Sequence, residues 1–376
     1  MGVDYRPDHS FRIPDPALSA ETGSPDACLR CHIDQASIWS QERVIEWYGP
    51  GRKAQYGSVF ARARRGDPDA GTDLRALATD LLYPVIVRAT ALQLLAAYPG
   101  IENSQVVEIA LQDDEALIRR TAITTIESPD RAELAKRIAP ALYDPVKTVR
   151  IEAASRLAGD LSIHLDEDQA KRQREVLQEY ITAMTYTADF ASSRLNLANL
   201  HGTLDRPEDA IREYRQAIRI DDQFYPAKVN LAILLSQRGQ NQQAEKLLRE
   251  VTASNPELFE AAYSLGLLLV ELQNYREAVT YLEKAANGLP ERGRIQYNLG
   301  LLYAFLQNAG AAEKALMAAL SIEPGNLDFQ YALADFYLKA GRFEQARPIA
   351  ETMASTHPEN PIGGQMLEFI RRNTGR

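Results

Sequence analysis

The chain has 376 residues, of which 45% are hydrophobic and 25% charged, so it is long enough to bury a substantial core. Its formal net charge of −9 argues against general affinity for nucleic acids or anionic membranes, because both need a basic surface. No apolar run reaches the length of a membrane span, and residues 1–16 lack the apolar core of a signal peptide.

Residues 1–27 are rich in Pro, Asp and Ser and show neither helical nor strand periodicity, which predicts an irregular segment. Both cysteines of the chain follow directly, in the sequence "CLRCH" of residues 28–32. Two cysteines are too few for a disulfide framework, so we expect their thiols to act as ligands or attachment points.

The C-x-x-C-H pattern is typical of c-type haem attachment. The spacing of Cys28 and Cys31 places both sulfurs within one helical turn, where they can add to the two vinyl groups of one porphyrin. His32 then lies over the ring, and its imidazole can bind the iron from the proximal side. Three alternatives remain open: a zinc site in which His9 supplies the fourth ligand, a redox dithiol, and a chance pattern. The dithiol is disfavoured because a surrounding βαβ pattern is absent.

The next segment contains a first internal repeat, with a constant spacing of 31. An aliphatic residue followed by arginine recurs at Val87-Arg88, Ile118-Arg119 and Val149-Arg150. Two further series keep this period: Ala91, Ala122 and Ala153, then Leu95, Ile126 and Leu157. The stretch "DPVKTVRIEAASRL" resembles the second helix of a HEAT repeat, with Pro145 at a helix start, and Pro84 is expected to start the equivalent helix of the first hairpin. We expect three short helical hairpins over residues 66–160, followed by a connecting helix over 161–187.

A second internal repeat, with a constant spacing of 34, occupies residues 188–360. A leucine precedes a small residue in each of five copies, at Ala198, Ala232, Gly266, Gly300 and Ala334. A second small-residue series keeps the same period, at Ala210, Ala244, Ala278, Ala312 and Ala346, and prolines mark the repeat ends at Pro256, Pro290, Pro324 and Pro358. Small residues let two helices approach closely, and proline stops a helix. Segments such as "YNLGLLYAFLQNAGAAEKALMAALSIEP" resemble the tetratricopeptide repeat, which predicts five stacked hairpins and a capping helix over 361–376.

The first helix of each such repeat lines the concave side of the array, where we expect a protein partner to bind. Tyrosines that recur with the period of the second repeat are predicted to form a ladder along this groove: Tyr263, Tyr297 and Tyr331. Tyrosine is also common at this position for packing reasons alone. The groove is further expected to include Leu267, Val270, Leu301 and Phe305, with Asn196, Asn230 and Asn298 as hydrogen-bonding groups for a peptide backbone. Arg294 has no basic equivalent in the other repeats, so a clamp for a C-terminal carboxylate is not predicted.

The first fifty residues resemble the last haem-binding segment of multihaem c-type cytochromes of the cytochrome c-554-like kind, which continue into HEAT and tetratricopeptide repeats. The residues that carry this resemblance are Met1, Val3, Asp4, Arg6, His9, Ser10, Phe11, Pro14, Gly23, Pro25, Ala27, Cys28, Cys31, His32, Trp39, Val44, Trp47, Tyr48 and Gly49. The resemblance implies bis-histidine ligation of the iron, and His9 is the candidate distal ligand. It also implies further C-x-x-C-H segments and an export signal upstream, so we expect the chain to be the C-terminal piece of a longer protein. Trp39, Trp47 and Tyr48 are expected to pack a core or a porphyrin edge.

The predicted fold is an all-α solenoid in which HEAT-like hairpins precede five tetratricopeptide repeats. The expected divisions are residues 1–65 for the haem-attachment segment with a short helix, 66–160 for the HEAT-like hairpins, 161–187 for the connecting helix, 188–360 for the five repeats and 361–376 for the cap.

The predicted function is that of the C-terminal part of a periplasmic multihaem cytochrome. One haem c on Cys28 and Cys31 would transfer electrons, and the repeats would bind a redox protein or a complex subunit. The alternatives are a scaffold without haem, and the same scaffold with a zinc-bound N-terminus. No catalytic constellation or glycine-rich phosphate loop is recognisable, so an enzyme is not predicted. We expect the protein in the periplasm if haem is attached, and in the cytoplasm if Met1 is the true start.

Overall fold

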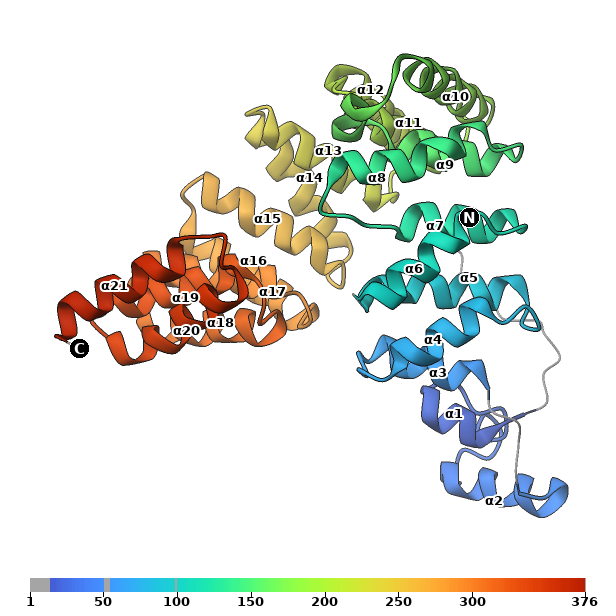
Figure 1. The fold of residues 1–376 in the computed structure, drawn as a ribbon, viewed down its shortest axis with the longest axis horizontal. Coiled ribbons are helices and arrows are strands. Elements are labelled where there is room, and N and C mark those ends of the chain that lie inside the picture. Colours follow the sequence, from blue (N-terminus) through green and yellow to red (C-terminus); the bar gives the residue numbers. More distant parts are fainter. Residues whose placement is uncertain (1–13, 51–54, 99, 376) are drawn as a thin grey trace. The chain divides into compact units, whose positions relative to one another are not determined.

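The computed structural model describes residues 14–50, 55–98 and 100–375, and every regular element in these ranges is a helix (Figure 1). The all-α prediction is therefore confirmed. The chain divides into two compact units, one formed by residues 1–188 and 199–206 and the other by 189–198 and 207–376. No helix in the described part of the chain is both long and apolar enough to cross a bilayer.

The first unit begins with three short helices. These are α1 (Pro16–Thr22), α2 (Ser37–Tyr48) and α3 (Tyr56–Arg64). The prediction that residues 1–27 are irregular is wrong for α1, because Asp15 caps this helix by accepting a hydrogen bond from the Leu18 amide at 3.1 Å. Pro16 occupies the first helical position, where its missing N–H does no harm.

Three helix pairs follow, one for each copy of the first repeat, and Figure 1 shows them stacked in chain order. The pairs are α4 (Ala70–Thr79) with α5 (Val85–Leu94), α6 (Ile101–Ala110) with α7 (Ala116–Thr125), and α8 (Arg131–Ile138) with α9 (Lys147–Arg156). Short 3-10 helices lie at η1 (Leu95–Ala97), η2 (Ala139–Tyr143) and η3 (Gly159–His164). The periodic alanines Ala91, Ala122 and Ala153 are fully buried between the pairs. Helix α9 starts two residues after Pro145, which therefore precedes the helix instead of starting it.

The periodic arginines link each pair to the next element. Arg88 forms an ion pair with Asp113, Arg119 with Asp144 at 2.6 Å, and Arg150 with Glu179 at 2.7 Å. Arg119 also donates to the backbone carbonyls of Asp113 and Asp114. Each arginine thus satisfies both a carboxylate and backbone carbonyls that the hairpins leave free, which explains why the residue recurs. Glu179 lies on α10 (Glu167–Tyr186), which begins with a capping box of Asp166 and Gln169.

The helices of the second repeat also follow the predicted period. They are α11 (Ala191–Thr203), α12 (Pro207–Ile220), α13 (Tyr225–Gln237), α14 (Asn241–Ser254), α15 (Phe259–Glu271), α16 (Tyr275–Gly288), α17 (Gly293–Phe305), α18 (Ala309–Ile322), α19 (Leu327–Lys339), α20 (Phe343–Thr356) and the terminal α21 (Ile362–Thr374). Helices α14, α16, α18 and α20 each end two residues before the periodic proline.

Small residues hold the two helices of a hairpin close together. A Cβ atom added to Gly266 would lie 2.8 Å from the Leu282 side chain, and one added to Gly300 would lie 2.7 Å from that of Leu316. Ala278 and Ala312, from the second small-residue series, are fully buried. The helices within a hairpin therefore approach more closely than larger side chains would allow.

Candidate functional site

The sequence "CLRCH" forms one tight turn before α2. The carbonyl oxygen of Cys28 accepts hydrogen bonds from the backbone amides of Cys31 at 3.2 Å and His32 at 3.0 Å. Cys28 is half-buried, whereas Cys31 and His32 are exposed. The turn therefore brings both thiols to one short loop and leaves one thiol and the imidazole open to a ligand.

Asp26 anchors this turn to α2. Its carboxylate accepts from the Cys28 amide at 2.8 Å and from the hydroxyl of Ser40, a fully buried residue of α2, at 2.5 Å. Burial raises the pKa of Asp26, but the hydrogen bonds from Ser40 and the backbone outweigh it and hold the pKa below its usual value. Burial and the neighbouring Asp26 carboxylate raise the pKa of the Cys28 thiol. Cys28 is therefore kept as a protonated thiol at neutral pH.

The residues of the turn fit the donor set of a c-type haem. Cys28 and Cys31 are separated by one turn, and the exposed His32 follows directly, with its ring centroid 4.7 Å from that of Trp39. Large apolar side chains are exposed on the same segment, namely Ile33, Ile38, Ile45, Trp47 and Tyr48. Trp47 and Tyr48 do not pack a protein core, because they are 62% and 76% exposed at the end of α2, and their packing against a porphyrin edge stays a prediction.

The zinc alternative stays a prediction, because one of its four ligands lies outside the described residues. Within the ranges that the structure describes, no three His, Cys, Asp or Glu side chains lie together in a group that could hold a metal ion. His9, the proposed fourth ligand of zinc and the candidate distal ligand of haem, lies outside the described residues.

The three predicted groove tyrosines have different surroundings. The Tyr263 hydroxyl accepts a hydrogen bond from the Asn298 amide at 2.7 Å. The Tyr297 ring stacks on the buried Phe329, with centroids 5.2 Å apart. Of the three, Tyr331 alone is exposed, at 43% of its surface. Tyr263 and Tyr297 thus serve contacts between neighbouring repeats, and Tyr331 is the one that presents a free ring.

The predicted polar groups of the groove are also engaged within the array. Arg294 forms an ion pair with Asp328 at 3.1 Å, and its guanidinium lies 5.0 Å from the centre of the Tyr297 ring. Asn230 forms a hydrogen bond with Tyr214, and Asn196 lies on α11.

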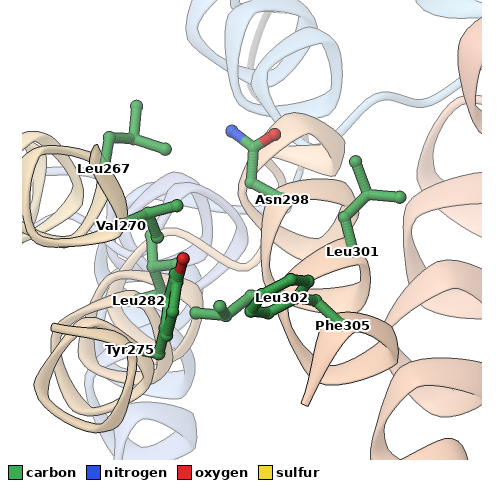
Figure 2. Close-up of a pocket in the computed structure, with 8 residues that line it drawn as sticks. All are labelled: Leu267, Val270, Tyr275, Leu282, Asn298, Leu301, Leu302 and Phe305. Carbon is green, nitrogen blue, oxygen red and sulfur yellow. The ribbon is translucent and has the colours of Figure 1, made fainter. Parts of the chain in front are cut away.

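An apolar pocket opens between the third and fourth copies of the second repeat (Figure 2). Its volume is about 360 Å³, and its lining comes from α15, α16 and α17: Leu267, Val270, Tyr275, Leu282, Asn298, Leu301, Leu302 and Phe305. Five of these residues were predicted for the groove. The other three were not predicted, because only one face of the first helices was expected to line the groove. Tyr275 and Leu282 lie on the second helix α16, and Leu302 lies on α17. The one sequence feature that could have indicated a contribution from the second helix is the aromatic residue at its start, Tyr275. Its ring centroid lies 4.8 Å from that of Phe305.

Comparison with known proteins identifies the repeats. Residues 204–266 and 306–367 match a family model described as "tetratricopeptide repeat", and residues 259–287 match a second model with the same description. No curated protein sequence matches the chain at a significant level. Both matching family models describe tetratricopeptide repeats, so the HEAT and cytochrome assignments stay predictions.

Several solved structures are similar to the chain. MamA from Desulfovibrio magneticus RS-1 is 20% identical, with 50% of this chain and 97% of MamA covered and a TM-score of 0.40. YrrB, described as a TPR protein with an unusual peptide-binding site, is 19% identical, with 50% and 96% covered and a TM-score of 0.41. Pseudomonas aeruginosa PilF is 21% identical, with 49% and 83% covered and a TM-score of 0.44.

The chain therefore contains tetratricopeptide repeats, as the spacing of the small residues and prolines predicted. Repeats of this class form extended binding surfaces and are typically not catalytic, which supports an interaction protein rather than an enzyme.

Proposed function

We propose that the protein is a scaffold that binds a protein partner through the first helices of its tetratricopeptide repeats. The observation that carries this proposal is the apolar surface around the pocket of Figure 2. Leu301 is 41% exposed and Phe305 is 63% exposed, although both belong to a well-packed helix. Exposed apolar side chains that border a pocket are typical of a protein interaction site.

Selection from a library of random peptides displayed on phage tests this function. Peptides selected on the full chain should bind Phe305→Ser at least about tenfold more weakly, since a buried aromatic anchor contributes about 2 kcal/mol or more. Met317→Ser is the matched control, because Met317 is 51% exposed on α18 and does not line the pocket. Failure to select any peptide, or selected peptides that bind Phe305→Ser as tightly as the parent, would contradict the proposal.

A second candidate function is electron transfer through a haem attached to Cys28 and Cys31. It is favoured by the turn geometry, the exposed imidazole of His32 and the exposed apolar side chains of the same segment. When bound, a c-type haem supplies one-electron chemistry. Asp26 and Ser40 would hold the Cys28 end of the turn, and Trp39 would limit the rotation of the His32 ring. Because such attachment occurs outside the bacterial cytoplasm, this candidate function also implies a periplasmic protein, with a redox protein as its partner.

Export-directed expression together with a haem-attachment system tests the second candidate. The product should show a Soret absorption band that survives denaturation and extraction with acidified acetone, and the Cys28→Ser/Cys31→Ser double variant should lack it. A colourless exported chain would contradict haem attachment and leave the scaffold function intact. Stoichiometric zinc in a colourless chain would instead support the zinc alternative.

A further inference from the structure

We infer that the segment of the partner that enters the pocket between α15, α16 and α17 is an amphipathic helix. The inference rests on the proposed scaffold function, since it specifies the ligand of the same groove. Three features of the pocket support it: its volume, the small number of hydrogen-bonding groups on its walls, and the distribution of charge around it.

The volume of the pocket exceeds what one side chain fills. A cavity of about 150 Å³ holds a benzene molecule, so a pocket of about 360 Å³ has room for two groups of that size. Two neighbouring side chains of the partner must then point in the same direction. Residues three or four positions apart on a helix do this, with Cβ atoms about 5–6 Å apart, and so do residues two apart on a strand, so the choice between the two rests on the backbone.

The walls of the pocket offer almost no partners for a peptide backbone. Six of its eight lining residues carry no polar side-chain atom, Tyr275 adds one hydroxyl, and Asn298 already donates its amide to the Tyr263 hydroxyl. An extended peptide would leave backbone N–H and C=O groups unpaired against this surface, at a cost of about 1–3 kcal/mol for each buried group. A helix satisfies its own backbone groups and presents only side chains. The carbonyl oxygen of Asn298 remains as an acceptor for one polar side chain at the edge of the helix.

The charged residues near the pocket indicate which charges the partner should carry beside its apolar face. Residues 261–270 and 295–312, which form most of the lining, contain no Asp, Glu, Lys or Arg. Glu271 follows Val270 directly, is exposed, and accepts a hydrogen bond from the Ser236 hydroxyl at 3.1 Å. It forms no ion pair within the described ranges of the chain. We therefore expect the partner to have an uncharged apolar face, with a basic residue beyond the Val270 end of that face, on the side of Glu271.

Two synthetic peptides of equal composition test this inference on the full chain. Both have about 14 residues, enough for nearly four helical turns, and contain only leucine, glutamine and lysine. One has its leucines at helical spacing along one face, and the other has them at alternating positions, as in a strand. Binding of each fluorescein-labelled peptide is followed by fluorescence anisotropy at about 0.15 M salt.

The helical-pattern peptide should bind at least about tenfold more tightly than the alternating one. Leu301→Ser and Phe305→Ser should each weaken its binding by about tenfold, Glu271→Gln by a few fold, and Met317→Ser should leave it unchanged. Equal or tighter binding of the alternating peptide would overturn the inference, and so would binding that is unaffected by Phe305→Ser. Binding of neither peptide would also overturn it, whereas the library selection decides the scaffold function separately.

Discussion

Gly288, the last residue of α16, is the position where the structure predicts the sharpest steric effect of a single methyl group. A Cβ atom at this position would lie 2.2 Å from Cγ of Phe259 and 2.3 Å from both Cδ atoms. Because Cγ is joined directly to Cβ of Phe259, the ring cannot move away without a change of rotamer or a shift of α15. Overpacking of this kind costs about 1–3 kcal/mol, and the helix propensity of alanine returns about 0.5–1 kcal/mol. At the middle of both ranges the net effect of Gly288→Ala is a loss of about 1–2 kcal/mol in the free energy of unfolding.

Thermal unfolding followed by far-UV circular dichroism measures this effect. For a unit of about 150–250 residues, each kcal/mol shifts Tm by about 2–4 °C, so Gly288→Ala should lower Tm by about 2–8 °C. Gly310→Ala is the control, because Gly310 is also helical and a Cβ there meets no atom within 4 Å. The control should be neutral or slightly more stable than the parent. A Tm for Gly288→Ala at or above that of the control would refute the reasoning.

The remaining predictions concern the first unit. Arg119→Ala should destabilise it by about 1.5–3 kcal/mol in urea unfolding, since the Asp144 carboxylate loses a charged hydrogen-bond donor but keeps the Val146 amide. Burial raises the pKa of Asp144, but hydrogen bonds from Arg119 and a backbone amide lower it more, below its usual 3.8. As the pH falls, the Asp144 carboxylate therefore takes up a proton in the unfolded chain before it does so in the folded chain. The stabilisation by the pair should be complete above about pH 4 and disappear at lower pH. Asp26→Asn should lower the pKa of Cys28 and speed its alkylation relative to that of Cys31, measured by mass spectrometry of the labelled peptides.

Each of these outcomes has a clear contrary result. If Arg119→Ala unfolds at the parental urea concentration, the ion pair of Arg119 with Asp144 does not stabilise the first unit. If the parent and Arg119→Ala lose stability equally below about pH 4, the pH dependence has another source. An unchanged ratio of Cys28 to Cys31 labelling in Asp26→Asn would show that burial alone controls the Cys28 thiol.

Some residues of the groove could be predicted from the sequence and others could not. Leu267, Val270 and Leu301 could be placed on one face because the helix period and the repeat period together fix which positions share a face. Tyr275 and Leu282 could not, since they belong to the second helix of the hairpin and reach the pocket only through the angle at which it packs against α17.

The repeating arginines show the same limit in the first unit. Their even spacing singled out Arg119 and Arg150, but not the acceptors Asp144 and Glu179. The acceptors of Arg88 and Arg119 are aspartates 25 residues further on and recur with the period of 31, whereas Arg150 meets a glutamate 29 residues further on, so the repeat period could have indicated the first two acceptors but not the third. In α2, likewise, helical periodicity could not show that Trp47 and Tyr48 would be exposed, because exposure depends on what packs beside the helix end.

The sequence by itself determined the helical class, the two repeat periods and the positions where helices must approach closely. These properties follow from local rules: small residues at fixed spacing, proline at helix ends, and apolar residues on one face. Only the tertiary structure decided which of the groove tyrosines is free, where the pocket opens and which carboxylate each arginine meets. Those outcomes depend on packing angles between elements, which a sequence period does not specify.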